Sequence, residues 1–375
     1  MKVLITGSDG FIGKNLRLYL IERKDIDVVC FTRSDEVSQL PELLKDVDYV
    51  FHLAGINRTV DQAEYMMGNT NLTKILCDAV GTVVSLTGKK VTVLYASSTQ
   101  AACDNVYGSS KLGAEKLLIE LRRIYDLPVY IFRLPNVFGK WCKQNYNSVV
   151  ATFCHNIIRG LPIHIADPDS SITLAYIDDV IECFMRIMDG EDTRAGSNGF
   201  DIVAPLYTIT VGELAQKIFS FKEGRSTLVV ERVGTGLMRA LYSTYISYLP
   251  VDLCTYSLKR HADARGSFVE MLKTRDSGQF SYFTAHPGVT RGGHYHHSKT
   301  EKFLVISGRA RFKFKHMQTG QSYELITSGD VAQVVETIPG WAHDITNVGR
   351  DDLIVMLWAN EIFDEDNPDT FTHSL

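Results

Sequence analysis

The sequence is 375 residues long, which at roughly 100–200 residues per domain is enough for two domains. Hydrophobic residues make up 45% and charged residues 22% of it, close to the averages for soluble globular proteins. The 39 Lys and Arg residues against 44 Asp and Glu residues give a net charge of −5, too small to favour nucleic acid or an anionic membrane as a partner. The first residues, MKVLIT, look like a strand rather than a signal peptide, and the sequence has no apolar run of about 18 residues. We therefore expect a soluble cytoplasmic protein that binds no nucleic acid and is not inserted in a membrane.

Cysteine and histidine residues are distributed unevenly along the chain. The seven cysteines form no CxxC pair and are odd in number, which favours reduced thiols over disulfides. No cysteine lies beyond Cys254, whereas eight of the eleven histidines lie beyond residue 260. This shift indicates a domain boundary, and we expect one domain over residues 1–250 and a second over residues 251–375.

The first part of the chain alternates short β-branched runs with helical patterns. This alternation predicts an α/β fold of the Rossmann type, a doubly wound parallel sheet with crossover helices on both faces. Residues 135–250 are less regular and are expected to hold substrate loops. The expected strands are residues 2–6, 27–31, 49–54, 91–98 and 129–134, and the expected helices are residues 14–24, 62–86 and 109–125.

The last third of the chain has short strands separated by Gly, Asp, Asn and Pro turns, without a long helical pattern. Regular short strands of this kind predict an all-β barrel or jelly roll. The expected strands are residues 279–285, 301–307, 309–316, 322–326 and 353–358.

A glycine motif, TGSDGFIG at residues 6–13, directly follows the first expected strand and opens the first helix. Glycines there let the backbone turn tightly and approach a pyrophosphate, which the helix N-terminus then stabilises. A trio of glycines is also compatible with a plain turn, but its place between strand and helix favours a dinucleotide site. At the end of the second strand, where an acidic residue normally accepts the ribose 2′-hydroxyl of NAD, the sequence has Arg33. We therefore expect NADPH as the cofactor; the alternative for Arg33 is a solvated surface position.

A second motif, YGSSK, places Tyr107 and Lys111 four residues apart and therefore on one face of a helix. A tyrosine ionises near pH 10, so its use as an acid or base at neutral pH requires a nearby cation such as Lys111. Pairs with this spacing are common by chance, and the prediction depends on their combination with the glycine motif and with YASS at the end of the fourth strand.

The first 250 or so residues resemble the extended short-chain dehydrogenase/reductase family of nucleotide-sugar enzymes. The matching stretches are TGSDGFIG, HLAG at 52–55, the serine pair at 97–98, YGSSK, and RLPNVFG at 133–139. The resemblance implies that Tyr107 transfers the proton, that Lys111 also binds the nicotinamide ribose, and that Ser98, with Ser97 as the fallback, holds the substrate oxygen. It also implies substrate contacts from Arg133 and Asn136. The cofactor-binding residues it implies are Gly7, Gly10, Phe11, Ile12, Gly13, Arg33, Leu53, Ala54, Gly55, Tyr107 and Lys111.

The second half contains a histidine cluster, GGHYHHSKTEKFLVISG at residues 292–308. Alternate residues of a strand share a face, so His294 and His296 should point one way while Tyr295 and His297 point the other. Together with Glu301 and with His343 from the stretch PGWAHDITN, they make a set of three histidines and one glutamate. Nitrogen and oxygen ligands suit Zn²⁺, and also Fe, Mn or Ni. The alternative is a surface patch or a polar hydrogen-bond network.

The spacing G-x5-H-x-H-x4-E-x6-G resembles the first motif of the cupin superfamily, whose small β-barrels hold a divalent metal. The second motif departs from the pattern, with Pro-Gly in place of Pro-x-Gly, which makes His343 a weaker candidate ligand. DARGSFVE at 263–270 and GVTRGGHYH at 288–296 also resemble sugar-nucleotide epimerases of the dTDP-keto-rhamnose type, in which the histidine of RGxH is a catalytic base. On that alignment His294 is the base instead of a ligand. We favour a metal held by His294, His296, Glu301 and His343, with Zn²⁺ polarising a ketone or enolate or only stabilising the barrel.

Across essentially its whole length, including NEIFDEDNPDTF at 360–371, the sequence resembles the CapF-type capsular polysaccharide synthesis enzymes. The resemblance implies a bifunctional enzyme of UDP-N-acetyl-L-fucosamine synthesis, acting on a UDP-linked 4-keto-6-deoxy amino sugar. The cupin domain would epimerise C3 of a UDP-2-acetamido-2,6-dideoxy-4-hexulose, and the reductase domain would reduce the C4 ketone with NADPH to UDP-2-acetamido-2,6-dideoxy-β-L-talose. Because cupins usually associate, we expect a homodimer. The alternatives are an NAD-dependent nucleotide-sugar 4-epimerase or dehydratase that uses its cupin for dimerisation, and a pair of inactive sensor domains.

Overall fold

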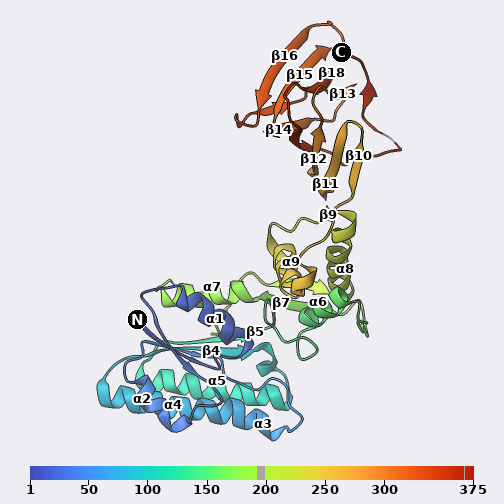
Figure 1. Ribbon diagram of the computed structural model, residues 1–375. Coiled ribbons are helices and arrows are strands. Elements are labelled where there is room, and N and C mark those ends of the chain that lie inside the picture. The colour runs from blue at the N-terminus through green and yellow to red at the C-terminus, as the bar shows by residue number, and fades with distance from the viewer. Residues whose placement is uncertain (192–198, 367) are drawn as a thin grey trace. The chain divides into compact units, whose positions relative to one another are not determined.

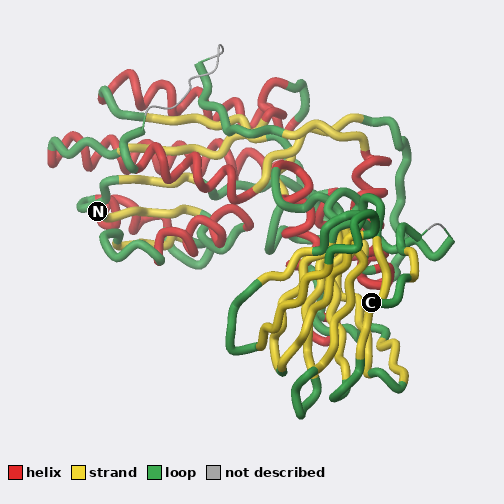
Figure 2. Tube along the Cα trace, turned by 90° about the horizontal axis from the view of Figure 1, so that it is seen from above, coloured by secondary structure: helices red, strands yellow, loops and turns green. Residues whose placement is uncertain are grey.

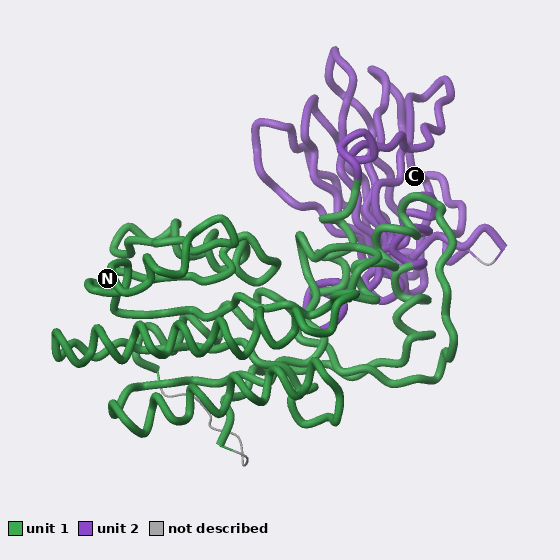
Figure 3. Tube along the Cα trace, turned by 90° about the horizontal axis from the view of Figure 1, so that it is seen from below, with its two compact units in different colours: residues 1–218, 240–249 green, residues 219–239, 250–375 purple. Residues whose placement is uncertain are grey.

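The computed structural model describes residues 1–191, 199–366 and 368–375, so Asn367 of the terminal stretch 360–371 lies outside the described residues. The chain forms two compact units, residues 1–218 with 240–249 and residues 219–239 with 250–375 (Figure 3). The segment 219–239 precedes the boundary expected at residue 250 and still packs with the second unit. The reason is a strand pairing, because β9 (Val229–Val230) lies parallel to the end of β11 (Gly266–Thr274).

The first unit contains the predicted parallel sheet. All its strands are parallel, in the order β2-β1-β3-β4-β5. The apolar runs that predicted the inner strands are buried, and Val3, Leu4 and Ile5 are fully buried, whereas the edge strand β2 is only partly buried. The strands are β1 (Lys2–Thr6), β2 (Asp27–Phe31), β3 (Tyr49–His52), β4 (Thr92–Ser98) and β5 (Val129–Leu134).

Helices cover both faces of this sheet, with α1 and α7 on one face and α2, α4 and α5 on the other (Figure 1). Helices α1 and α5 begin three residues earlier than predicted because the motif residues open them, with Gly10 and Asn105 as N-caps. The stretch predicted as one helix over 62–86 is divided by a π-helical segment, Met66–Asn71. Among the described residues, no helix combines the length and apolar character that a membrane span requires. The helices named here are α1 (Phe11–Ile21), α2 (Leu40–Leu44), α3 (Ala63–Tyr65), α4 (Leu72–Thr87), α5 (Val106–Tyr125) and α7 (Ile177–Met188).

The described part of residues 135–250 is more regular than the sequence suggested, and the expectation that this stretch holds substrate loops stays a prediction. These residues contain a small sheet of order β6-β7-β8 and helices whose apolar faces are buried. Long connections separate these elements, so the sequence shows no even alternation of strand and helix. The elements are β6 (Asn136–Phe138), β7 (Ser171–Tyr176), β8 (Tyr207–Thr210), α6 (Val149–Arg159), α8 (Val211–Thr227) and α9 (Gly236–Ser247).

The second unit is the predicted all-β cupin barrel, built from two sheets of mostly antiparallel strands (yellow in Figure 2). One sheet has the order β10-β11-β12-β19-β14-β17, and the other has the order β16-β15-β18-β13-β20. The core between them includes Phe283, Phe303 and Phe312. The remaining strands are β10 (Arg260–Asp263), β12 (Gly278–Ala285), β13 (Thr290–Tyr295), β14 (Glu301–Ser307), β15 (Arg309–His316), β16 (Ser322–Ser328), β17 (Val334–Glu336), β18 (Trp341–Asn347), β19 (Leu353–Ala359) and β20 (Phe371–Thr372).

Candidate functional site

The glycine motif joins β1 to α1 through a turn that only glycines can form. Gly7 has a positive φ of 71°, and a Cβ on it would lie 2.7 Å from the Cα of Ala54. A Cβ on Gly13 would lie 2.3 Å from the carbonyl oxygen of Gly7. The helix can therefore begin directly against the strand, with Gly10 as its N-cap.

A cavity of about 790 Å³ opens beside this turn, within the first unit. Phe11, Ile12 and Gly13 form the first turn of α1 and are not among the described residues that line it. Glycine-rich backbone, an exposed arginine and apolar side chains are the surroundings that a dinucleotide requires, so the cavity fits the expected cofactor. Of the predicted cofactor residues, the cavity is lined by Gly7, Gly10, Arg33, Leu53, Ala54 and Gly55.

Arg33 follows β2 at the edge of this cavity, and its side chain is exposed. Within the described part of the chain it has neither an ion pair nor a side-chain hydrogen bond, so its guanidinium is free to bind an anion. The sequence reasoning did not consider Asp35, two residues later, which also lines the cavity. The Asp35 carboxylate accepts hydrogen bonds from the backbone N–H and the hydroxyl of Thr32, at 2.7 and 2.8 Å, and these bonds lower its pKa.

Ser98 at the end of β4 and Tyr107 in the first turn of α5 are brought together. Burial raises the pKa of Tyr107, a side-chain hydrogen bond with Ser98 acts against this shift, and Tyr65 adds to it. The Tyr65 and Tyr107 rings are 5.6 Å apart. At neutral pH Tyr107 is therefore protonated, as a proton donor must be.

Lys111 is buried one turn beyond Tyr107 on α5. Its ammonium donates to the carbonyl oxygen of Ala96 at 3.0 Å and lies 4.9 Å from the centroid of the Tyr95 ring. Burial lowers its pKa to about 8, while the charge of Glu115 acts in the opposite direction. The predicted effect of Lys111 on the pKa of Tyr107 stays a prediction.

Glu115, one turn beyond Lys111, connects two of the candidate residues. Ser97 donates to this buried carboxylate at 2.5 Å, and Arg133 donates to both of its oxygens at 3.0 and 2.6 Å. Arg133 also stacks on Phe200, with 3.8 Å between the guanidinium carbon and the ring centroid. Because the Ser97 hydroxyl is already bound to Glu115, Ser98 is favoured as the serine that holds substrate. These contacts also hold Arg133 within the protein, whereas Asn136, at the start of β6, is exposed.

Asn69, in the π-helical segment, is a further residue of this site that sequence reasoning missed. Its side-chain amide exchanges hydrogen bonds with the backbone of Ile56, at 2.9 and 3.0 Å, and donates to the hydroxyl of Ser110 at 2.9 Å. A Cβ on Gly55 would lie 2.7 Å from the Asn69 side-chain oxygen and 3.2 Å from the Lys111 ammonium. No spacing in the sequence identifies Asn69, because its neighbours come from distant segments.

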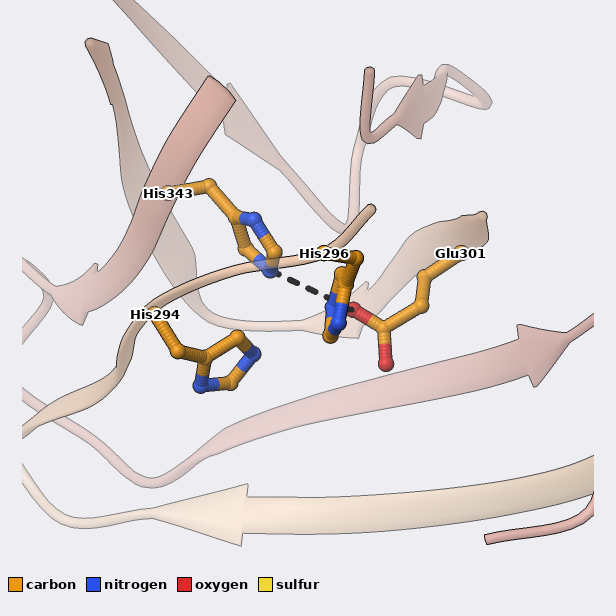
Figure 4. A group of neighbouring side chains, drawn as sticks. All are labelled: His294, His296, Glu301 and His343. Carbon is orange, nitrogen blue, oxygen red and sulfur yellow. Dashed lines mark hydrogen bonds and ion pairs between the residues drawn. The ribbon is translucent and has the colours of Figure 1, made fainter. Parts of the chain in front are cut away.

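In the second unit, the predicted metal ligands converge inside the barrel (Figure 4). His294 lies near the end of β13, His343 lies opposite it on β18, and Glu301 begins β14 in the other sheet. One potential ligand atom from each of the four residues lies within 4.8 Å of all the others. The Glu301 oxygen Oε2 is 3.2 Å from Nε2 of both His296 and His343. Four ligands of a tetrahedral zinc ion lie about 3.3–3.6 Å apart, so the cluster has the dimensions of a metal site.

The orientations of the histidines indicate a cation between these groups. Nδ1 of His296 donates to the carbonyl oxygen of Asp369 at 2.5 Å, so the neutral ring presents a lone pair at Nε2. That lone pair faces the Glu301 carboxylate, and two acceptors 3.2 Å apart repel each other unless a proton or a metal ion lies between them. The cluster therefore fits a metal ion by its donor atoms and by their directions.

The lowered pKa values of His294 and Glu301 keep their ligand atoms unprotonated at neutral pH. Burial lowers the pKa of His294 to about 4, helped by His343, so this ring is neutral at pH 7. Burial raises the pKa of Glu301, but its close interactions with His296 and His343 outweigh this effect and hold the pKa well below its usual range. Lys299, a buried lysine that the sequence did not single out, lies 3.5 Å from the other Glu301 oxygen, Oε1.

The predicted alternation of faces along β13 is confirmed. The His294 and His296 rings are 4.9 Å apart within the cluster. Tyr295 and His297 instead contact Phe371, at 5.4 and 4.7 Å between ring centroids.

Comparison with known proteins agrees with this two-unit architecture. Residues 3–202 match the NAD dependent epimerase/dehydratase family, and residues 261–371 match the polysaccharide biosynthesis C-terminal domain. The solved structure of the capsular polysaccharide assembling protein CapF from Staphylococcus aureus has a TM-score of 0.90 and 39% identity, and the match covers 100% of both chains. The chain belongs to the CapF family.

A curated relative is more similar in sequence. It is a Pseudomonas aeruginosa protein described as UDP-2-acetamido-2,6-beta-L-arabino-hexul-4-ose reductase, 58% identical over 100% of this chain and 99% of the relative. The first unit alone shares its fold with the UDP-glucuronic acid 4-epimerase of Bacillus cereus, at 17% identity and a TM-score of 0.54 over 66% of this chain and 98% of that one. Both units of the chain therefore follow the CapF pattern.

The low pKa of Lys111 predicts a pH-dependent stability in this member of the CapF family. Its pKa of about 8 in the folded protein lies below the usual lysine value of 10.5. The unfolded chain therefore binds more protons between these pH values, and the penalty for burying the ammonium is relieved as pH rises. We expect the free energy of unfolding of the wild type, relative to Lys111→Met, to increase by about 1–2 kcal/mol between pH 7 and pH 9.5.

Urea denaturation of both proteins at the two pH values measures this difference. Lys116→Met, at an exposed position on the same helix, is the matched control and should leave the pH dependence unchanged. An equal difference between wild type and Lys111→Met at pH 7 and 9.5 would show that Lys111 keeps an ordinary pKa.

Proposed function

We propose that this chain is a bifunctional nucleotide-sugar enzyme of capsular polysaccharide synthesis. The cupin unit epimerises C3 of a UDP-2-acetamido-2,6-dideoxy-4-hexulose, and the first unit reduces the C4 ketone with NADPH to UDP-2-acetamido-2,6-dideoxy-β-L-talose, a step of UDP-N-acetyl-L-fucosamine synthesis. The observation that carries the proposal is that two sets of candidate reactive residues lie on one chain. Ser98, Tyr107 and Lys111 accompany a glycine-lined cavity, and a histidine–glutamate cluster occupies a cupin barrel. The description of the Pseudomonas relative as a hexul-4-ose reductase supports the reductase half.

The chemistry fixes the order of the two steps. A proton on C3 is acidic only while the neighbouring C4 ketone can take up the negative charge as an enolate. Reduction removes that ketone and locks the configuration at C3. Epimerisation therefore precedes reduction, and one chain with both activities uses the same ketone twice.

In the reductase step, the residues of α5 and β4 control the proton. NADPH, when bound, supplies the hydride. Tyr107, protonated because burial raises its pKa, donates its proton to the oxygen that becomes the C4 hydroxyl. Ser98 hydrogen-bonds the same oxygen, and Lys111 places a positive charge near the tyrosine in a low-dielectric environment.

We propose NADPH over NADH because of the two charged groups that follow β2 at the cavity. Arg33 is exposed at the cavity edge and can pair with a 2′-phosphate, whereas the Asp35 carboxylate already accepts hydrogen bonds from Thr32. A free acid at this place would instead favour the ribose hydroxyls of NADH.

In the cupin unit, His294, His296, Glu301 and His343 would hold a divalent metal, for which Zn²⁺ suits the donor set. The metal, when bound, supplies a Lewis acid that polarises a ketone or enolate oxygen, or stabilises the barrel. His294 has two alternative roles, as the fourth metal ligand or as a general base. It is neutral at pH 7 because of its low pKa, and either role needs the neutral ring. The homodimer and the cytoplasmic location stay predictions.

Isotope exchange separates the two proposed activities. In D₂O without NADPH, the wild type should exchange the C3 proton of the 4-keto sugar nucleotide for deuterium and form no reduced product. Tyr107→Phe should keep this exchange but lose NADPH-dependent reduction by about 10²–10⁴-fold, because it cannot donate a proton. Proton NMR follows the exchange, and the near-ultraviolet absorbance of NADPH follows its oxidation.

Tyr125→Phe, at the far end of the same helix, is the matched control and should keep both activities. A wild type that exchanges no C3 proton would refute the epimerase assignment. Purified protein with tightly bound NAD and no net reduction would favour the 4-epimerase or dehydratase alternative.

Replacing Arg33 tests the choice of cofactor. In Arg33→Ser the KM for NADPH should rise by about 10–100-fold, since a charge-assisted hydrogen bond contributes about 1.5–3 kcal/mol, while the KM for NADH should stay the same. Arg17→Ser, an exposed arginine on α1, is the control. Equal KM values for NADPH in Arg33→Ser and the wild type would assign Arg33 to the solvated surface.

Metal analysis tests the ligand set. His343→Ala should lose bound metal after dialysis against a chelator at a concentration that leaves the wild type loaded, because it removes one of the converging ligands. His286→Ala, an exposed histidine paired with Asp352, should retain the metal. His294→Ala distinguishes the two roles of that residue: loss of metal identifies a ligand, and loss of C3 exchange with metal retained identifies a base.

A further inference from the structure

Asp369, close to the C-terminus, contacts every residue from His296 to Lys299, the stretch that leads from one proposed metal ligand toward the next, Glu301. Its carboxylate accepts hydrogen bonds from the backbone N–H of His297, Ser298 and Lys299, at 2.8, 2.8 and 2.9 Å. It also accepts one from the hydroxyl of Ser298, at 2.9 Å. Four charge-assisted hydrogen bonds from consecutive residues fix the path of this turn.

The backbone of Asp369 acts on the first ligand itself. Its carbonyl oxygen accepts the Nδ1–H of His296 at 2.5 Å. Because a carbonyl can only accept, this bond places a proton on Nδ1, so Nε2, which points toward Glu301, is the nitrogen that can bind a metal. A partner of this kind fixes the tautomer and the ring direction of a histidine ligand.

The turn that the Asp369 carboxylate holds leads to Glu301, the second ligand, and so determines its position. Lys299, whose backbone N–H is bound by Asp369, sends its buried ammonium to within 3.5 Å of Glu301 Oε1. The other oxygen of Glu301, Oε2, remains directed toward His296 and His343. One residue thus orients a histidine directly and a glutamate through the turn and Lys299.

The chain after Asp369 is tied to the same strand. Strand β20 (Phe371–Thr372) pairs with the end of β13, and the backbone N–H of His373 donates to the carbonyl of Gly293 at 2.8 Å. The Phe371 ring stacks on Tyr295, on the face of β13 opposite the metal cluster. Asp369 is therefore held in place independently of any metal.

We propose that Asp369 is a positioning residue of the metal centre, which sets the tautomer of His296 with its carbonyl and the geometry of the ligand-bearing turn with its carboxylate. The inference rests on the proposed function, because it assumes that the cluster binds a metal. It adds to that function a residue that lies outside the ligand set and 73 positions beyond His296 in the sequence.

The test is the affinity of the full-length chain for Co²⁺ and Zn²⁺, measured by competition with a chromogenic chelator after the metal has been stripped. Asp369→Ala should bind about 10–100-fold more weakly than the wild type, the usual effect of removing a residue that orients a metal ligand. The visible absorption of bound Co²⁺ should change in position or intensity, because it reports the ligand geometry. Asp369→Asn, which keeps one acceptor oxygen for the turn, should recover part of the affinity.

Asp364→Ala, an exposed acidic residue of the same C-terminal segment, is the matched control and should bind as the wild type does. The circular dichroism spectrum of each metal-free variant shows whether the chain is folded. Equal affinities and Co²⁺ spectra in the wild type, Asp369→Ala and Asp369→Asn would overturn the inference about Asp369 but not the proposed metal site. A wild type that binds neither metal would overturn the proposed metal site and the inference with it.

Discussion

Each unit of this protein holds charged groups out of water next to its candidate reactive residues, and the cost of doing so determines how each site is built. An unpaired charge in a protein interior is unfavourable by several kcal/mol or more. In the first unit, the Lys111 ammonium is placed against a carbonyl and an aromatic ring, and the Glu115 carboxylate is neutralised by Arg133. In the second unit, the Glu301 carboxylate is surrounded by two histidines and a lysine. The folds differ, but each holds a buried ion near the group that would do the chemistry.

This constraint explains why hydrogen bonds hold the side chains around each buried charge in place. Ser97 and Arg133 cannot turn away from Glu115 without leaving that buried carboxylate partly unpaired. Their positions fix the ends of β4 and β5, where Ser98 is presented. A raised pKa at Tyr107 and a lowered one at Lys111 follow from the same burial, which favours the neutral form of both groups.

The sequence predicted the features that depend on local pattern. The strands of the parallel sheet and the alternation of His294 and Tyr295 follow from periodicity. The spacing of the first cupin motif brought out His294, His296 and Glu301, and the weaker second motif brought out His343. Features that depend on contacts between distant segments were missed. Asn69 reaches the site only because a π-helical segment lies beside Gly55, and Asp369 reaches the histidine–glutamate cluster from a separate strand pairing. The helices of residues 149–188 were missed because their connections are long, so no alternation with strands was visible.

The segments of the two units alternate along the chain, and this alternation limits how the units can be separated. Residues 219–239 belong to the second unit and residues 240–249 return to the first, so the chain passes between the units three times. A fragment that starts at residue 251 would lack strand β9, and one that ends at residue 218 would lack α9 (Gly236–Ser247). No single break in the chain yields two whole units, so neither unit can be obtained as one uninterrupted segment.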